Sequence, residues 1–217
     1  MTRAIVFDLD GTLFDTREDL AETVNRTRED FGLARQSVAW AVGFVGQGAK
    51  YLLSHTVCDE IKDRVVGIDE VWPVFSRHYA ETCCDKLQPY AGVPETLEEL
   101  RRRGFALGVN TNKPNFAVRE IFRKFGFDKL FGEAIIAGGD CAALKPSVES
   151  MNALASRMNR AFTSEDWMVG DSWTDLKCAA NAGVKGAFCA FGFGQLADAP
   201  YDLWLDRFDK LQDLIRE

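Results

Sequence analysis

The stretch that decides the fold lies at the start of the chain and reads Ala4-Ile5-Val6-Phe7-Asp8-Leu9-Asp10-Gly11-Thr12. Four apolar residues come first, and two acids and a glycine follow, which predicts a short buried strand ending at Asp8. Further along, an apolar stripe at helical spacings of four and three is formed by Leu20, Val24, Thr27 and Phe31. We therefore expect a strand and then a helix, with acidic residues between them.

Helical patterns continue to about residue 86, with a glycine-rich connection at 43–48. From about residue 90 the sequence pattern changes. Prolines and a glycine mark the change at Pro89, Gly92 and Pro94. Strands and helices alternate from there on. The expected strands cover residues 105–109, 134–137, 167–169 and 187–190, and the last expected helix between them covers 176–182.

Alternating strands and helices imply a parallel sheet with helices on both faces. The helical block separates the first strand from the others. We predict an α/β fold, with a Rossmann-like, doubly wound parallel core of residues 1–15 and 87–217. An all-helical cap domain, residues 16–86, is inserted into this core.

Composition and charge limit the class of protein. The chain has 217 residues, 47% hydrophobic and 27% charged, which suits one large domain with a modest insertion. The net charge of -7 argues against nucleic acid as a partner, because an acidic surface repels phosphates. The six cysteines form no CxxC pair, so we expect reduced thiols and a cytoplasmic setting. We expect neither a signal peptide nor a membrane span, which needs roughly 20 apolar residues.

Polar groups follow the predicted strands at the sheet edge where ligands bind in open parallel sheets. In chain order these positions carry Asp8 to Thr12, Asn110 to Pro114, Lys145 with Pro146 after a loop, and Gly170 to Asp175. Carboxylates, a hydroxyl, an amide and an ammonium thus converge on one edge. We expect them to form a single site.

Phosphoryl transfer needs the chemical groups that these positions offer. One carboxylate can attack phosphorus and form an aspartyl-phosphate, and a second can protonate the leaving oxygen and later take a proton from water. A hard cation such as Mg²⁺, which prefers oxygen ligands, must offset the clustered negative charge. A lysine and hydrogen-bond donors must hold the non-reacting phosphate oxygens.

The four sites, in this order, resemble the motifs of the haloacid dehalogenase superfamily of phosphatases. The chain is most similar to the phosphoglycolate phosphatase branch, and the similarity covers essentially its whole length. Relatives that cleave carbon–halogen bonds resemble a pattern without an acid at position 10. A halide leaves without a proton, whereas an alkoxide benefits from a donor, so Asp10 favours phosphate chemistry.

The resemblance implies a role for each matched residue. Asp8 would be the nucleophile and a Mg²⁺ ligand, and Asp10 the general acid/base and a ligand through its backbone carbonyl. Asp171 would be the third protein ligand of Mg²⁺, with Asp175 as a direct or indirect metal partner. The phosphoryl group would be held by Thr111, Asn112 and Lys145, and the lysine would also hold the nucleophile ionised.

Several of these residues also have simpler interpretations. Asp171, Ser172 or Asp175 could cap the following helix, with or without a role in the site. Lys113 either approaches the substrate or points to solvent. The only two histidines lie in the helical block and are expected to be structural or solvent-facing: His55 and His78.

The helical block resembles the caps that close over the site in this superfamily, exclude water and read the leaving group. The segment Gly46-Gln47-Gly48 resembles the glycine pair of phosphoglycolate phosphatase caps. Its backbone could approach a small anionic substrate, and Lys50 could pair with the substrate's charge. A plain helix-to-helix turn is the alternative. After Lys145-Pro146 the branch commonly has further prolines, whereas residues 147–150 are Ser-Val-Glu-Ser here, a departure that concerns the substrate rather than the chemistry.

We therefore expect a Mg²⁺-dependent phosphatase, a monomer or homodimer, that hydrolyses a small phosphorylated metabolite such as 2-phosphoglycolate. Neither nucleic acid nor a membrane is an expected partner. A phosphomutase acting on a sugar phosphate, a pyrophosphatase and a nucleotidase are the alternatives. A catalytically silent regulatory protein would be expected to lack Asp8, Asp10 or Lys145, and all three are present.

Overall fold

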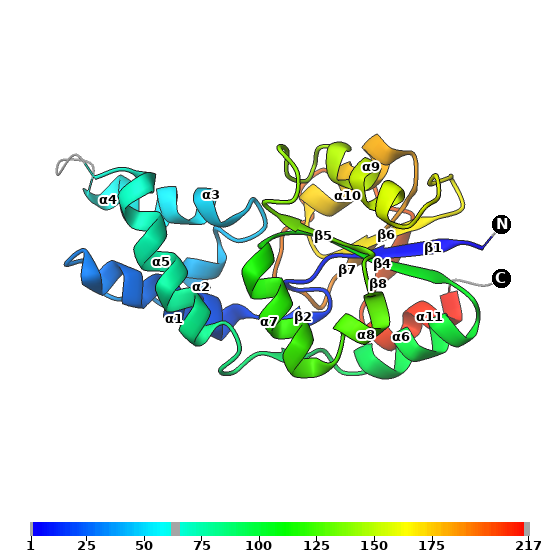
Figure 1. Cartoon of the computed structure of the whole chain (residues 1–217), viewed down its shortest axis with the longest axis horizontal. Coiled ribbons are helices and arrows are strands. Elements are labelled where there is room, and N and C mark those ends of the chain that lie inside the picture. The colour runs from blue at the N-terminus through cyan, green and yellow to red at the C-terminus, as the bar shows by residue number, and fades with distance from the viewer. Residues whose placement is uncertain (1, 62–65, 215–217) are drawn as a thin grey trace.

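The computed structural model describes residues 2–61 and 66–214. Among them, six strands form one sheet in the order β5-β4-β1-β6-β7-β8, and all neighbouring strands are parallel (Figure 1). The strands are β1 (Ala4–Phe7), β4 (Ala106–Pro114), β5 (Ile135–Gly138), β6 (Trp167–Gly170), β7 (Lys185–Cys189) and β8 (Leu203–Leu205). The predicted parallel α/β architecture is confirmed.

Helices cover both faces of the sheet (Figure 1). One face carries α9 (Glu149–Arg157) and α10 (Trp173–Ala182). The other carries α6 (Val93–Arg102), α7 (Asn115–Phe125), α8 (Asp128–Phe131), the 3-10 turn η3 (Phe208–Lys210) and α11 (Leu211–Leu214). Successive side chains of β1 serve the two faces, as the pleat of a strand requires. Ile5 and Phe7 join one apolar cluster and Val6 joins the other.

The helical block contains α1 (Arg17–Asp30), α2 (Val38–Val42), α3 (Ala49–Leu53), the π-helical turn η1 (Ser54–Cys58), α4 (Asp59–Ile61) and α5 (Ile68–Thr82). It has an apolar core of its own, in which Leu20 and Val24 of α1 cluster with Val71 and Phe75 of α5. The chain enters and leaves the block through two short antiparallel strands, β2 (Phe14–Asp15) and β3 (Gln88–Pro89). The division into a core, residues 1–15 and 87–217, and a cap, residues 16–86, stays a proposal.

The predicted strand and helix limits were wrong in several places. The strand expected at 105–109 runs to Pro114, and its pairing with β5 shifts register between Asn110 and Pro114. Such an irregularity redirects side chains and keeps polar residues inside the strand. The helix expected from residue 176 begins at Trp173, because Ser172 caps it. The last predicted strand, 187–190, lies at 185–189.

All six cysteines are free thiols, as the sequence predicted. No helix within residues 2–61 and 66–214 is long and apolar enough to cross a membrane.

Candidate active site

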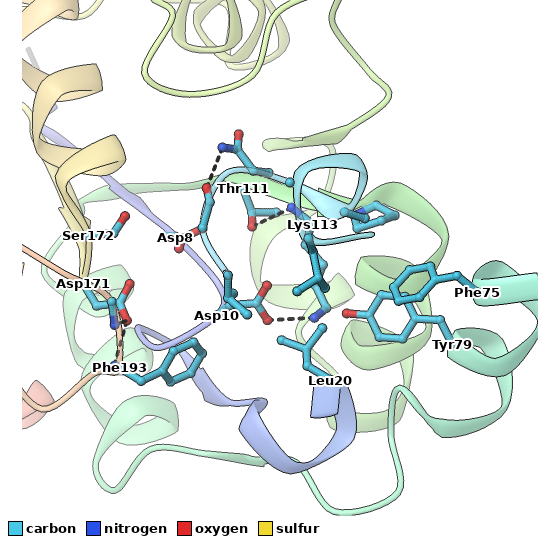
Figure 2. Close-up of a pocket in the computed structure, with 18 residues that line it drawn as sticks. Asp8, Asp10, Leu20, Phe75, Tyr79, Thr111, Lys113, Asp171, Ser172 and Phe193 are labelled. Carbon is cyan, nitrogen blue, oxygen red and sulfur yellow. Dashed lines mark hydrogen bonds and ion pairs between the residues drawn. The ribbon is translucent and has the colours of Figure 1, made fainter. Parts of the chain in front are cut away.

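Most of the predicted site residues line one pocket between the sheet and the helical block (Figure 2). Asp8 follows β1 directly, Thr111 lies in the last part of β4, and Asp171 follows β6. Lys145 comes from the loop after β5, and its ammonium reaches Asp8. The carboxyl ends of four strands thus supply the groups that the sequence placed at one edge.

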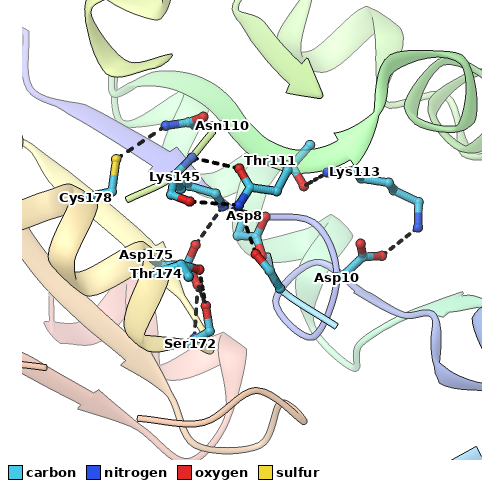
Figure 3. Close-up of polar contacts among 12 residues, drawn as sticks. Asp8, Asp10, Asn110, Thr111, Lys113, Lys145, Ser172, Thr174, Asp175 and Cys178 are labelled. Carbon is cyan, nitrogen blue, oxygen red and sulfur yellow. Dashed lines mark hydrogen bonds and ion pairs between the residues drawn. The ribbon is translucent and has the colours of Figure 1, made fainter. Parts of the chain in front are cut away.

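Lys145 lies between two carboxylates (Figure 3). Its Nζ is 2.8 Å from Oδ1 of Asp8 and 2.6 Å from Oδ1 of Asp175. The lysine and Asp175 side chains are 1% and 0% exposed, and that of Asp8 is 10% exposed. A buried charge is tolerated only when it is paired and hydrogen-bonded, and the ammonium of Lys145 is paired with both carboxylates.

One ammonium does not balance the acids of this cluster. Burial raises the pKa of Asp8 to about 6, against the opposing effect of Lys145, and repulsion from Asp175 and Asp10 adds to the rise. Burial, then repulsion from Asp175 and Asp8, raises the pKa of Asp171 well above its ordinary value. A further cation at this position would relieve the excess negative charge.

Backbone N–H groups hold Asp171 from the loop that follows β7. Phe193 N and Gly194 N donate to its Oδ2 over 3.0 and 2.7 Å. Glycine is needed around this carboxylate, because a Cβ at Gly11, Gly192 or Gly194 would overlap it. Sequence reasoning missed this loop. The signal was present, since Gly192-Phe193-Gly194 follows a predicted strand as the other site residues do.

Asp175 has both carboxylate oxygens engaged. Oδ1 accepts from Lys145, and Oδ2 accepts from the backbone N and the Oγ of Ser172 over 3.0 and 2.6 Å. Ser172 and Asp175 form a capping box at the start of α10, which settles which residue caps this helix. Asp171 is left outside the cap and faces the pocket.

The acids form a group suited to a hard cation. Ligand oxygens of Asp8, Asp171 and Asp175 lie within 4.8 Å of one another, and all three residues are buried. Oδ2 of Asp8 and Oδ1 of Asp171 accept no hydrogen bond from any described residue. All-oxygen donor sets are those that Mg²⁺ prefers, so the residues present fit this ion.

Asp10 lies nearer the helical block and is held separately. Its Oδ1 accepts from Thr16 Oγ1 and from Lys113 Nζ, both at 2.7 Å (Figure 3). Lys113 is buried, so the solvent-facing interpretation of this lysine was wrong. Its long side chain runs beneath the helical block and ends in an ion pair with Asp10. Sequence reasoning did not identify Thr16, which lies at the first turn of α1.

Asn112 differs from the other predicted phosphate ligands in where its side chain goes. Its Nδ2 donates to the carbonyls of Gly46 and Lys145 over 2.9 and 3.1 Å, and its Oδ1 accepts from Lys145 N over 2.8 Å. The amide is therefore occupied by backbone atoms. Thr111 is buried in the pocket wall and retains a hydroxyl that can donate.

The cap residues divide into two groups. Gly46 and Gly48 line the pocket, whereas Gln47 and Lys50 are not among the residues that line it. Lys50 is exposed, so the structure does not bring it to the site as predicted. Helical spacing explains this, because the residues of α3 that face the pocket are three apart: Ala49 and Leu52.

The two histidines lie away from the site. His78 Nε2 is 2.9 Å from Asp30 Oδ2, and His55 Nδ1 is 2.9 Å from the carbonyl of Tyr51. Neither lines the pocket.

Comparison with known proteins agrees with this geometry. A family model described as haloacid dehalogenase-like hydrolase matches residues 5–189. The chain belongs to this family. A phosphoglycolate phosphatase from Mannheimia succiniciproducens is 31% identical to the chain and covers 99% of it, with 97% of the relative covered. Another from Aquifex aeolicus is 29% identical, with 98% and 96% covered.

A solved structure has the same fold. The crystal structure of a predicted phosphoglycolate phosphatase from Haemophilus somnus 129pt superposes with a TM-score of 0.88 at 28% identity. The superposition covers 99% of this chain and 98% of the other. The predicted resemblance to this family of hydrolases is thus confirmed. So is the predicted enzyme class, a phosphoric monoester hydrolase.

Proposed function

We propose that the protein is a Mg²⁺-dependent phosphatase that hydrolyses a small phosphate monoester through an aspartyl-phosphate on Asp8. The observation that carries the proposal is the separation of two acids in one pocket. Asp8 is held by Lys145, and Asp10 is held separately by Thr16 and Lys113. A nucleophile and a proton donor on opposite sides of the reacting phosphorus is the arrangement that ester hydrolysis needs.

Each residue of the site has a distinct role in the proposed reaction. Oδ2 of Asp8 attacks phosphorus, while Lys145 and the Thr111 hydroxyl hold the non-reacting oxygens. Asp10 gives its proton to the leaving alkoxide. In the second step of the reaction, which hydrolyses the aspartyl-phosphate, Asp10 takes a proton from water. The water oxygen attacks phosphorus and releases Asp8. The cap excludes bulk water while the phosphoryl group is on the enzyme.

The ion would be held directly by Asp8, Asp171 and the backbone carbonyl of Asp10. Asp175 would contribute indirectly, through its contacts with Lys145. When bound, Mg²⁺ supplies positive charge against the developing negative charge of the phosphoryl oxygens. Lys145 keeps Asp8 positioned, and the Phe193 and Gly194 amides keep Asp171 turned toward the same point.

A small substrate is favoured by the size of the pocket. Its volume is about 40 Å³, far below the roughly 300–1,000 Å³ of pockets that bind drug-sized ligands. The curated relatives named above are phosphoglycolate phosphatases. Both observations support 2-phosphoglycolate or a close analogue as the substrate.

Hydrolysis of para-nitrophenyl phosphate and of 2-phosphoglycolate tests the proposal in the presence of Mg²⁺. Asp8→Asn should abolish phosphate release from both. Asp198→Asn, the same substitution at a side chain that is 88% exposed, should leave it at the wild-type rate. Activity retained in Asp8→Asn would contradict the proposed nucleophile. An isomer formed from a hexose 1-phosphate without phosphate release would indicate a phosphomutase instead.

A further inference from the structure

The pocket wall that faces the leaving group is apolar, with one exception. The helical block contributes Tyr79 to this wall among side chains that offer no hydrogen bond: Leu20, Val45, Ala49, Leu52 and Phe75. A leaving group that enters here meets hydrocarbon everywhere except at the Tyr79 hydroxyl.

The Tyr79 hydroxyl is buried, and its hydrogen is unused. The residue is 1% exposed, and its hydroxyl oxygen accepts from the Lys113 ammonium, which leaves the hydroxyl hydrogen without an acceptor among the described residues. Figure 2 shows the hydroxyl directed toward the Lys113 ammonium. A buried hydroxyl hydrogen without an acceptor costs free energy, and such groups in native proteins call for an explanation. A bound ligand atom would provide the missing acceptor.

Lys113 has donor capacity left over. Its Nζ donates to Asp10 Oδ1 over 2.7 Å and lies 5.0 Å from the centre of the Tyr79 ring. An ammonium has three hydrogens, and the bonds to Asp10 and Tyr79 use two of them. Tyr79 and Lys113 therefore each keep one hydrogen to donate at the same corner of the pocket.

We propose that Tyr79 and Lys113 form a subsite for a carboxylate on the leaving group, and that this pair selects phosphorylated hydroxy acids over neutral esters. The inference rests on the proposed phosphatase function and specifies its substrate class. The carboxylate accepts one hydrogen bond from the Tyr79 hydroxyl and one from the Lys113 ammonium. Bonds of this charge-assisted kind are stronger than those between neutral groups.

The position of the subsite limits the length of the substrate. Lys113 Nζ lies 2.7 Å from the carboxylate of Asp10, the group that would protonate the ester oxygen. The ester oxygen and the carboxylate must therefore be close neighbours in the substrate. A carboxylate on the carbon that bears the ester oxygen meets this condition, as in 2-phosphoglycolate.

The test compares kcat/KM for 2-phosphoglycolate with kcat/KM for ethyl phosphate, which lacks the carboxylate. Tyr79→Phe removes only the hydroxyl and should lower the ratio of the two values by about tenfold or more. Tyr51→Phe is the matched control, since Tyr51 lies in the same helical block but does not line the pocket, and should keep the wild-type ratio.

Binding provides a readout that is independent of turnover. In the Asp8→Asn background, calorimetric titration should show that Tyr79→Phe weakens the binding of 2-phosphoglycolate. The affinity for ethyl phosphate should stay within about twofold of its value without the Tyr79 substitution. An unchanged ratio in an active enzyme would overturn the subsite alone. A wild type inactive on both esters would overturn the proposed function and the subsite with it.

Discussion

Lys145 forms ion pairs with two buried acids at once, and its removal should therefore affect both stability and turnover. Lys145→Met keeps the length of the side chain but leaves Asp8 and Asp175 without their shared cation. Breaking a buried pair from one side costs about 3–5 kcal/mol, so we expect a loss of that order in the free energy of unfolding without Mg²⁺. Loss of a group that stabilises the transition state costs on the order of 10²–10³-fold in kcat.

Urea denaturation and steady-state kinetics check both effects of Lys145→Met. Lys129→Met, at an exposed lysine of α8, should change neither quantity. A Lys145→Met enzyme as stable and as active as this control would contradict the role assigned to the lysine.

The titration of Asp8 predicts how Mg²⁺ stabilisation depends on pH. Its pKa rises from 3.8 to about 6 in the folded protein, mainly through burial. A carboxyl group with a raised folded pKa stabilises the fold below its unfolded pKa, and this contribution is lost as pH rises through about 6. Metal binding needs the ionised form. The increase in melting temperature caused by Mg²⁺ should therefore be larger at about pH 8 than at about pH 5.

Calorimetric scans with and without saturating Mg²⁺ measure this difference. Asp171→Asn should reduce the Mg²⁺ effect at the higher pH, because it removes a proposed ligand. An equal Mg²⁺ effect at both pH values in the wild type would contradict a metal site built on Asp8.

Side chains that follow predicted strands could be placed from the sequence alone. Asp8, Lys145 and Asp171 come to one edge because parallel strands end there. Thr16 and Tyr79 could not be placed, since they reach the site from α1 and α5. Their positions depend on how these helices pack over the sheet, which helical periodicity does not specify.

The turn after β1 is the element on which the acid cluster depends most closely. Gly11 has a φ of 77°, and a Cβ there would overlap the Asp171 carboxylate. Gly126, which ends α7, has a φ of 76°, but a Cβ there would meet only open space. Alanine has a similar backbone cost of about 1–2 kcal/mol at both positions, so the comparison isolates the effect of the overlap.

We expect Gly11→Ala to require at least about tenfold more Mg²⁺ for half-maximal activity, because a displaced Asp171 loses its ligand geometry. Gly126→Ala should lower the melting temperature but keep the wild-type Mg²⁺ requirement. Titration of activity against Mg²⁺ measures this requirement. Equal Mg²⁺ requirements in the two variants would show that the close approach of Gly11 to Asp171 does not affect Mg²⁺ binding.

Strand identity could be predicted from the apolar runs, but strand limits could not. β4 continues through Asn110, Thr111 and Asn112, whose polar side chains look like a loop in the sequence. They are tolerated inside a buried strand because the two asparagines have partners from distant segments. Asn110 donates to Ser150, and Asn112 exchanges hydrogen bonds with Lys145.

Across the whole molecule, the helical block lies beside one edge of the sheet (Figure 1). The pocket is lined by residues of both parts. Asn112 joins the two parts, since its amide contacts the carbonyl of Gly46 on one side and the backbone of Lys145 on the other. The position of the cap loop and that of the lysine beside the nucleophile are thereby linked. This arrangement explains why the glycine segment could be predicted to lie near the site while the roles of Gln47 and Lys50 could not.

In the proposed mechanism, Asp8 carries the phosphoryl group during turnover. The most direct measurement is mass spectrometry of peptides after the enzyme, mixed with Mg²⁺ and excess 2-phosphoglycolate, is quenched in acid within one turnover. We predict that the peptide containing Asp8 gains the mass of one phosphoryl group, and that Asp8→Asn gains none. Phosphate release at the full rate with no phosphorylated peptide, or a phosphoryl group on another residue, would contradict the account.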